Sequence, residues 1–150
     1  MGIGLYLESV SRKSKRVAEM VSDHHGQKLD PHYLGYFHCF NQQLFYEAHE
    51  VLEHLWLGDK HGPNGPFYKG LIQLTGAFVH LQRNHPQPAA ALFKLALANL
   101  NKYPRIHEHL NLEMTCQLAR KWLEELERGR FGVNPLTSQT APKLELEIKA

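Results

Sequence analysis

The segment from Leu44 to Trp56 carries the most regular helical pattern in the sequence. Its apolar residues recur at intervals of three and four, so they fall on one face of a helix: Leu44, Phe45, Ala48, Val51, Leu52, Leu55 and Trp56. A helix with one apolar face is stable only when that face is buried against other elements. The spacing therefore predicts a helix over residues 44–56 that packs within a larger helical protein.

Helix-end signals and apolar spacing predict further helices on both sides of this segment. Asp30 and Pro31 are typical of a helix N-cap and first helical position, and Gly129 is typical of a C-cap. Asn41 either caps a new turn or lies inside one long helix. Residues 61–66 (HGPNGP) form a dense turn signal and predict a loop. The predicted helices cover residues 3–21, a segment that starts at Asp30, and residues 67–83, 89–102 and 106–128.

These elements predict an all-α fold, a compact bundle of about five helices in a single domain. A chain of 150 residues that is 43% hydrophobic has enough apolar material for one core. We expect residues 1–30 to form an N-terminal helical extension, residues 31–129 the core, and residues 130–150 an irregular tail. Leu144, Leu146 and Ile148 alternate with charged residues, which favours an extended tail lying across the bundle.

Composition argues against several classes of protein. The net charge of +2 is too small to make a strong case for nucleic-acid binding, although the one basic cluster, residues 12–16, leaves an acidic partner or an anionic surface as an alternative. Cys39 and Cys116 lack metal or redox spacing, so we expect buried, reduced thiols. No apolar run reaches the roughly 18 residues of a membrane span and no secretory signal is recognised, which makes a cytoplasmic location our expectation.

A polar flank beside the apolar face of the 44–56 helix is the first half of a candidate site. His49 and Glu53 are spaced at i and i+4 and can touch, and Glu50 adds a second carboxylate. Tyr46 follows the same flank, and Trp56 closes the segment. Imidazole and carboxylate groups suit a divalent metal, or acid–base chemistry on a bound small molecule.

The second half of the site is expected on the 67–83 helix, which has a single polar stripe: Lys69, Gln73, Gly76, His80 and Arg83. Gln73 and His80 are two turns apart on one face, and Gly76 would allow another helix to approach closely. The predicted metal ligands are His49, Glu50, Glu53 and His80. The predicted ligand-binding residues are Tyr46, Glu50, Gln73 and Trp56. The predicted general base is His49 or Glu53, because burial at the core edge can move either pKa toward neutrality.

Simpler interpretations stand beside this one. The same residues could form a purely structural network, and Lys69 and Arg83 favour a solvated stripe on a buried helix. Familiar centres are not indicated, since the sequence has neither a complete His-Glu-x-x-His motif nor a Glu-x-x-His motif. The aromatic run Tyr33, Tyr36, Phe37 and Phe40 could line a partner groove or a dimer interface. Trp56 and Trp122 are expected in the core.

The motif Phe45-Tyr46-Glu47-Ala48-His49-Glu50-Val51-Leu52-Glu53, with Phe40-Asn41 before it and Trp56, Gln73, Ala77 and His80 after it, resembles the family catalogued as domain of unknown function 309. The resemblance spans about residues 36–128. It implies an all-helical bundle found in bacteria, archaea and photosynthetic lineages, with no reaction assigned. Its signature positions would correspond to Tyr46, Glu47, His49, Glu50, Glu53 and Trp56.

Two functions follow as hypotheses. The first is a protein whose polar pocket binds a divalent metal or a small polar ligand, with hydrolysis as the reaction if it is an enzyme. The second is a non-catalytic module for protein–protein interaction or scaffolding, in which the polar residues orient helices and a homo-oligomer could form.

Overall fold

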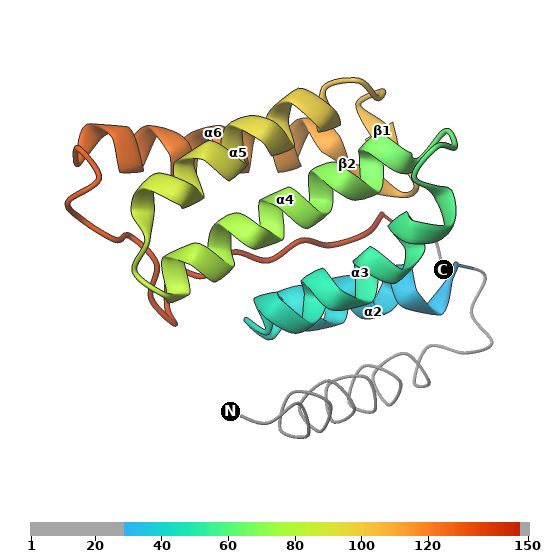
Figure 1. Cartoon of the computed structure of the whole chain (residues 1–150), viewed down its shortest axis with the longest axis horizontal. Helices are drawn as coiled ribbons and strands as arrows, with labels where there is room; N and C mark the ends of the chain where they lie inside the picture. The colour runs from blue at the N-terminus through green and yellow to red at the C-terminus, as the bar shows by residue number, and fades with distance from the viewer. Residues whose placement is uncertain (1–28, 148–150) are drawn as a thin grey trace, which may run out of the picture.

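The computed structural model describes residues 29–147 (Figure 1). Asp30 caps the first helix within this range. Its carboxylate accepts a hydrogen bond of 2.7 Å from the backbone N–H of His32, and Pro31 occupies the first turn, as predicted. Helix α2 (Pro31–Asn41) is followed closely by α3 (Phe45–Asp59). Gln43, with φ of 64°, makes the tight turn between them.

The remaining elements continue in the order predicted, with one addition. Helix α4 (Gly65–Gln82) and helix α5 (Pro86–Leu100) precede a two-stranded antiparallel hairpin of β1 (Ile106–His107) and β2 (Leu110–Asn111), and α6 (Leu112–Arg128) follows. Figure 1 shows α4 between the α2–α3 pair and the α5–α6 pair. The described residues thus form one mostly helical domain with five helices, which confirms the predicted fold class. None of the described helices is long and apolar enough to cross a membrane.

Phe78 of α4 lies at the centre of the core and is fully buried. Its ring packs against Phe45 at 5.1 Å and Phe40 at 5.7 Å between centroids, and on the other side against Phe93 at 5.2 Å and Trp122 at 5.1 Å. These four rings come from α3, α2, α5 and α6. A single aromatic side chain therefore joins all five described helices. The predicted core position of Trp122 is confirmed, whereas Trp56 is only partly buried and packs against the core from its edge.

The aromatic run of α2 is buried within the chain. Tyr33, Tyr36, Phe37 and Phe40 each expose 5% or less of their surface. The Tyr36 hydroxyl lies 2.7 Å from the Thr75 hydroxyl, and burial raises the pKa of Tyr36 above its ordinary value. The prediction that these rings line a partner groove or a dimer interface is therefore wrong, because they fill the domain core.

The last predicted helix begins later than expected. Residues 106–111 form the hairpin, whose turn residues Glu108 and His109 have positive φ of 48° and 62°. Glu108 and His109 are not one of the Asn-Gly, Asp-Gly or other glycine-containing pairs that mark a two-residue hairpin turn, so no hairpin was predicted here. Tertiary bonds hold the turn, since the Tyr33 hydroxyl donates to the Glu108 carbonyl and the Glu147 N–H donates to the His109 carbonyl, both at 2.7 Å. Helices α4 and α5 also begin two or three residues earlier than predicted, with proline in the first turn of each.

The C-terminal tail lies extended across the bundle, as predicted, within the described part of residues 130–150. Leu144 is buried, and Leu146 forms a bridge with Leu110 of the hairpin. Asn41, the last residue of α2, donates from Nδ2 to the Leu144 carbonyl at 2.8 Å and accepts from the Leu144 N–H at 2.7 Å. Ile148 and nearly all of the predicted 1–30 extension fall outside the described residues.

The role of Asn41 in holding the tail can be tested with the substitution Asn41→Ala. We expect the free energy of unfolding to fall by about 2 kcal/mol, because two hydrogen bonds are lost and both polar groups of Leu144 are left unpaired. Urea unfolding followed by circular dichroism measures this change. The exposed Asn101 is the matched control, and Asn101→Ala should change stability by less than about 0.5 kcal/mol. Equal effects of the two substitutions would show that Asn41 does not anchor the tail.

Candidate functional site

A hollow of about 280 Å³ lies where α3, α4 and α5 meet. We call it the α3–α4 hollow. Its described lining residues are Tyr46 and His49 of α3, six residues of α4 (Lys69, Ile72, Gln73, Gly76, Val79 and His80) and Leu92 of α5. The structure therefore brings Tyr46, His49, Gln73 and His80 together around one space.

Gly76 sits among these residues and lets α5 approach α4 closely. A Cβ atom at this position would lie 3.2 Å from Cδ1 of Leu92, which is tighter than ordinary van der Waals contact. The close approach predicted for Gly76 is thus present, and the neighbour that makes it is α5.

The His49 side chain lies between two residues of its own helix, Tyr46 one turn before it and Glu53 one turn after it. Its Nδ1 lies 3.6 Å from Oε2 of Glu53, too long for a hydrogen bond but within ion-pair distance when the imidazole is protonated. The ring of Tyr46 lies nearly parallel to it, with centroids 6.3 Å apart. Nδ1 of His49 is buried and has no hydrogen-bond partner within residues 29–147.

His80 presents the same feature from the facing helix. Its Nδ1 is also buried without a hydrogen-bond partner in the described part of the chain. Burial lowers the pKa of His80 below its ordinary value, and the nearby His85 and Arg83 lower it further. The lowered pKa favours the neutral imidazole of His80, in which one nitrogen donates and one accepts. Two facing helices thus each contribute a histidine to the lining of one hollow, and the Nδ1 of each has no hydrogen-bond partner among residues 29–147.

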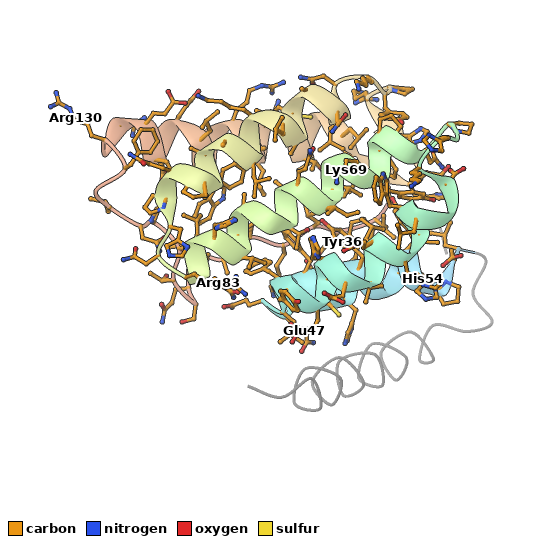
Figure 2. The ribbon with its side chains drawn as sticks, viewed as in Figure 1. Tyr36, Glu47, His54, Lys69, Arg83 and Arg130 are labelled. Atoms are coloured by element: carbon orange, nitrogen blue, oxygen red, sulfur yellow. The ribbon has the colours of Figure 1, made fainter. Side chains whose placement is uncertain are left out.

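Two cations lie along α4, Lys69 near its start and Arg83 at its end (Figure 2). Nζ of Lys69 lies 4.4 Å from the ring centroid of Trp56, and the guanidinium carbon of Arg83 lies 6.0 Å from that of Tyr46. Neither cation forms an ion pair with a carboxylate among residues 29–147. The sequence interpretation took both as marks of a solvated stripe and missed Lys69 as a lining residue. Its position four residues before Gln73 was the available signal.

Gln73 is held by α5. Nδ2 of Asn99 donates to Oε1 of Gln73 at 2.8 Å, so the oxygen of this amide is already engaged. The Nε2 group of Gln73, which can only donate, has no hydrogen bond within the described residues.

Three predicted site residues, Glu50, Glu53 and Trp56, are not among the described lining residues of the hollow. Glu53 reaches His49 from the rim, and Trp56 contacts Lys69. Across residues 29–147, no group of three or more His, Cys, Asp or Glu side chains is placed to hold a metal ion. Structural zinc sites and most catalytic ones use three or four protein ligands, so these residues do not fit a metal centre of that kind.

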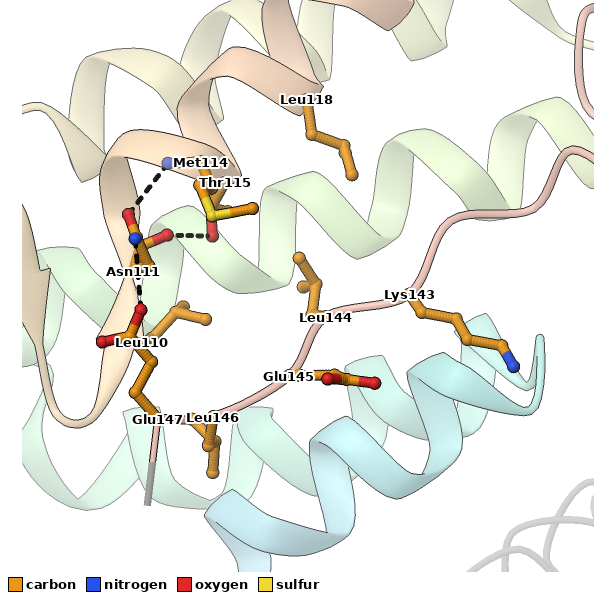
Figure 3. Close-up of a pocket in the computed structure, with 10 residues that line it drawn as sticks. All are labelled: Leu110, Asn111, Met114, Thr115, Leu118, Lys143, Leu144, Glu145, Leu146 and Glu147. Atoms are coloured by element: carbon orange, nitrogen blue, oxygen red, sulfur yellow. Dashed lines mark hydrogen bonds between the residues drawn. The ribbon is translucent and has the colours of Figure 1, made fainter. Parts of the chain in front are cut away.

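A second and larger hollow, of about 410 Å³, lies between α6 and the tail (Figure 3). Its walls are mostly apolar, and its hydrogen-bonding groups from the start of α6 are already paired. Asn111 accepts from the Met114 N–H at 3.0 Å and donates to Glu147 at 3.2 Å, and the Thr115 hydroxyl donates to the Asn111 carbonyl at 2.9 Å. The α3–α4 hollow differs because two of its polar atoms lack partners. Cys39 and Cys116 are buried free thiols, as predicted, and neither lines the two hollows.

A protein of Aquifex aeolicus (strain VF5) described as uncharacterized is 30% identical over 113 residues, which are 75% of this chain and 31% of that protein. The matched segment is therefore about a third of that relative's length. No solved structure matches this chain.

Residues 33–92 match the family described as Domain of unknown function (DUF309). This segment includes α2, α3, α4 and the first half of α5, and it contains every described lining residue of the α3–α4 hollow. The segment of residues 33–92 therefore belongs to the DUF309 family.

Proposed function

We propose that this protein binds a small polar molecule in the α3–α4 hollow. The observation that carries the proposal is that two histidines from facing helices, His49 and His80, line one space, and that the buried Nδ1 of each has no hydrogen-bond partner among residues 29–147. More than nine in ten buried polar groups in proteins have a partner, and leaving one without costs about 1–3 kcal/mol. Each ring carries a second nitrogen, so a ligand can bond to each histidine at that atom, or at Nδ1 once the ring has turned over.

The walls of the hollow also have the composition of a ligand site. Ile72, Val79 and Leu92 supply apolar surface, and a few polar side chains converge on the same space. Small-molecule sites are typically mostly apolar with a few placed polar groups, and a volume of about 280 Å³ is at the small end of their range. The proposed ligand is therefore small.

A reaction on the bound molecule is a second part of the proposal, separate from ligand binding. If a reaction occurs here, the base is His49, with Glu53 stabilising its protonated form from 3.6 Å. The described lining residues include no serine, threonine or cysteine, and the hydrolytic reaction proposed here uses water, activated by His49, as the nucleophile.

The binding proposal predicts that small molecules of at least one class perturb the hollow. We would titrate alcohols, amides, amines and carboxylates into ¹⁵N-labelled protein and follow the amide resonances of Gln73, Gly76 and His80. We expect saturable shifts, and at least tenfold weaker binding in the variant that combines His49→Ala with His80→Ala.

The exposed His61, outside the hollow, provides the matched control, and His61→Ala should bind as the wild type does. A hollow that holds only water would give no saturable shift with any class. That result, or unchanged binding in the double variant, would overturn the proposal.

The metal alternative predicts a different result. Because only two imidazoles and no carboxylate line the hollow among the described residues, we expect far less than one equivalent of zinc, manganese, iron or nickel per chain. Elemental analysis of protein made without a histidine tag measures this content, alongside the Glu53→Gln variant. Near-stoichiometric metal that is lost in Glu53→Gln would support the metal site and contradict our preference for a small molecule.

The free energy of unfolding distinguishes the scaffold alternative from ligand binding. We expect His49→Ala to lower the free energy of unfolding by less than about 1 kcal/mol, because its Nδ1 makes no hydrogen bond that could be lost. Phe45→Ala, on the same helix but in the core, should lower it by about 3 kcal/mol or more. Urea unfolding of the two variants makes the comparison. A loss of about 2 kcal/mol or more in His49→Ala would favour the structural network.

A further inference from the structure

We infer that the ligand of the α3–α4 hollow is a small monocarboxylate with a short apolar middle and a hydroxyl or carbonyl group at its far end. Its carboxylate lies at Lys69 and Gln73, and its far end lies at His49 and His80. This inference rests on the proposed function and names the class of ligand.

The charge of the hollow favours an anion. Lys69 is the one permanently charged residue among the described lining residues, and no carboxylate is among them. Its ammonium is held over the Trp56 ring at 4.4 Å and has no ion pair within residues 29–147. Trp56 is in this view a positioning residue that fixes the cation at the mouth of the site.

Hydrogen-bonding capacity at the same end favours a carboxylate. Gln73 is four residues after Lys69, so the two side chains are neighbours on one face of α4. The Gln73 oxygen is engaged by Asn99, which leaves its Nε2 group with two N–H donors. An ammonium and an amide N–H group together present only donors, and a carboxylate presents only acceptors.

The single cation favours a single negative charge. A phosphate monoester carries close to two charges at neutral pH, and its recognition usually involves several cations or an arginine fork. The described lining residues offer one lysine. A charge without a nearby counter-charge in a partly enclosed site is costly, so a monoanion matches this hollow better than a dianion.

The antiparallel arrangement of α3 and α4 places His49 and His80 at the end of the hollow opposite Lys69. Trp56 lies beside Lys69 and Tyr46 lies beside Arg83, so α3 and α4 run antiparallel. Figure 2 shows Lys69 and Arg83 well separated along α4. His49 is one turn after Tyr46, and it therefore lies toward the Arg83 end.

The middle of the hollow fits an apolar chain. His80 is on the same α4 stripe as Gln73 and two turns farther along, about 10 Å at 1.5 Å per residue. Between these ends lie Val79 and Leu92, with Gly76 adding no side chain, and Ile72 lines the hollow next to Gln73. A hydroxyl group both donates and accepts, so it can pair with a ring nitrogen of either imidazole whichever nitrogen carries the proton.

The test compares three probes of nearly equal size: 6-hydroxyhexanoate, 6-hydroxyhexanamide and hexanoate. Binding is measured at constant ionic strength from the amide resonances of Gln73, Gly76 and His80. We expect 6-hydroxyhexanoate to bind at least tenfold more tightly than 6-hydroxyhexanamide, which lacks the charge, and more tightly than hexanoate, which lacks the hydroxyl. We expect Lys69→Met, which keeps the side-chain length, to raise the Kd for 6-hydroxyhexanoate at least tenfold.

Lys94 of α5 is exposed and outside the hollow, so Lys94→Met is the matched control and should bind as the wild type does. If Lys69→Met fails to fold, as judged by circular dichroism, Lys69→Gln replaces it. Equal affinity for the acid and the amide, or an unchanged Kd in the Lys69 variant, would overturn the inference and leave the proposed function standing.

Two further outcomes would also overturn the inference. Tighter binding of 5-hydroxypentyl phosphate than of 6-hydroxyhexanoate would contradict the match of one cation to one charge. Absence of saturable shifts with all of these probes would contradict the monocarboxylate itself. The proposed function fails separately, when no probe from the wider set of alcohols, amides, amines and carboxylates perturbs the hollow.

Discussion

The packing of Phe78 against rings from α2, α3, α5 and α6 is the contact on which the other features of this domain depend. Burying this ring fixes the rotation of α4 about its own axis, because one face of the helix must point at the core. Gln73, Gly76 and His80, on the opposite stripe of α4, then line the α3–α4 hollow. The position of the hollow is thus a consequence of core packing.

Periodicity alone predicted part of the lining of the α3–α4 hollow, because it fixes the angles between side chains on one helix. Tyr46 and His49 on α3, and Gln73 and His80 on α4, were each assigned to a polar flank from spacing, and all four line the hollow. Periodicity does not fix how far one helix is rotated relative to its neighbour. Glu50 and Glu53 were predicted beside His80, but the observed rotation places them outside the lining. The hairpin at Glu108 and His109 was missed for a similar reason, since contacts from Tyr33 and Glu147, distant in sequence, hold its turn.

The two hollows show why volume alone does not identify a site. The larger one, beside the tail, has Asn111 and Thr115 already satisfied by hydrogen bonds within the protein. The smaller one is lined by two histidines whose Nδ1 atoms have no hydrogen-bond partner among residues 29–147. A gap between elements costs only the packing energy that is lost. An unpaired buried polar group costs more free energy, and most such groups in proteins have a protein or water partner.

The DUF309 match covers the part of the chain that lines the α3–α4 hollow. The matched segment, residues 33–92, ends at Leu92, which is also the last described lining residue of the hollow. Helix α6 and the tail lie beyond it and contact the core, Trp122 through Phe78 and Leu144 through Asn41. These C-terminal elements complete the burial of α2 and α4 without entering the hollow. Stability of the domain therefore depends on both parts, while every described lining residue of the hollow belongs to the matched segment.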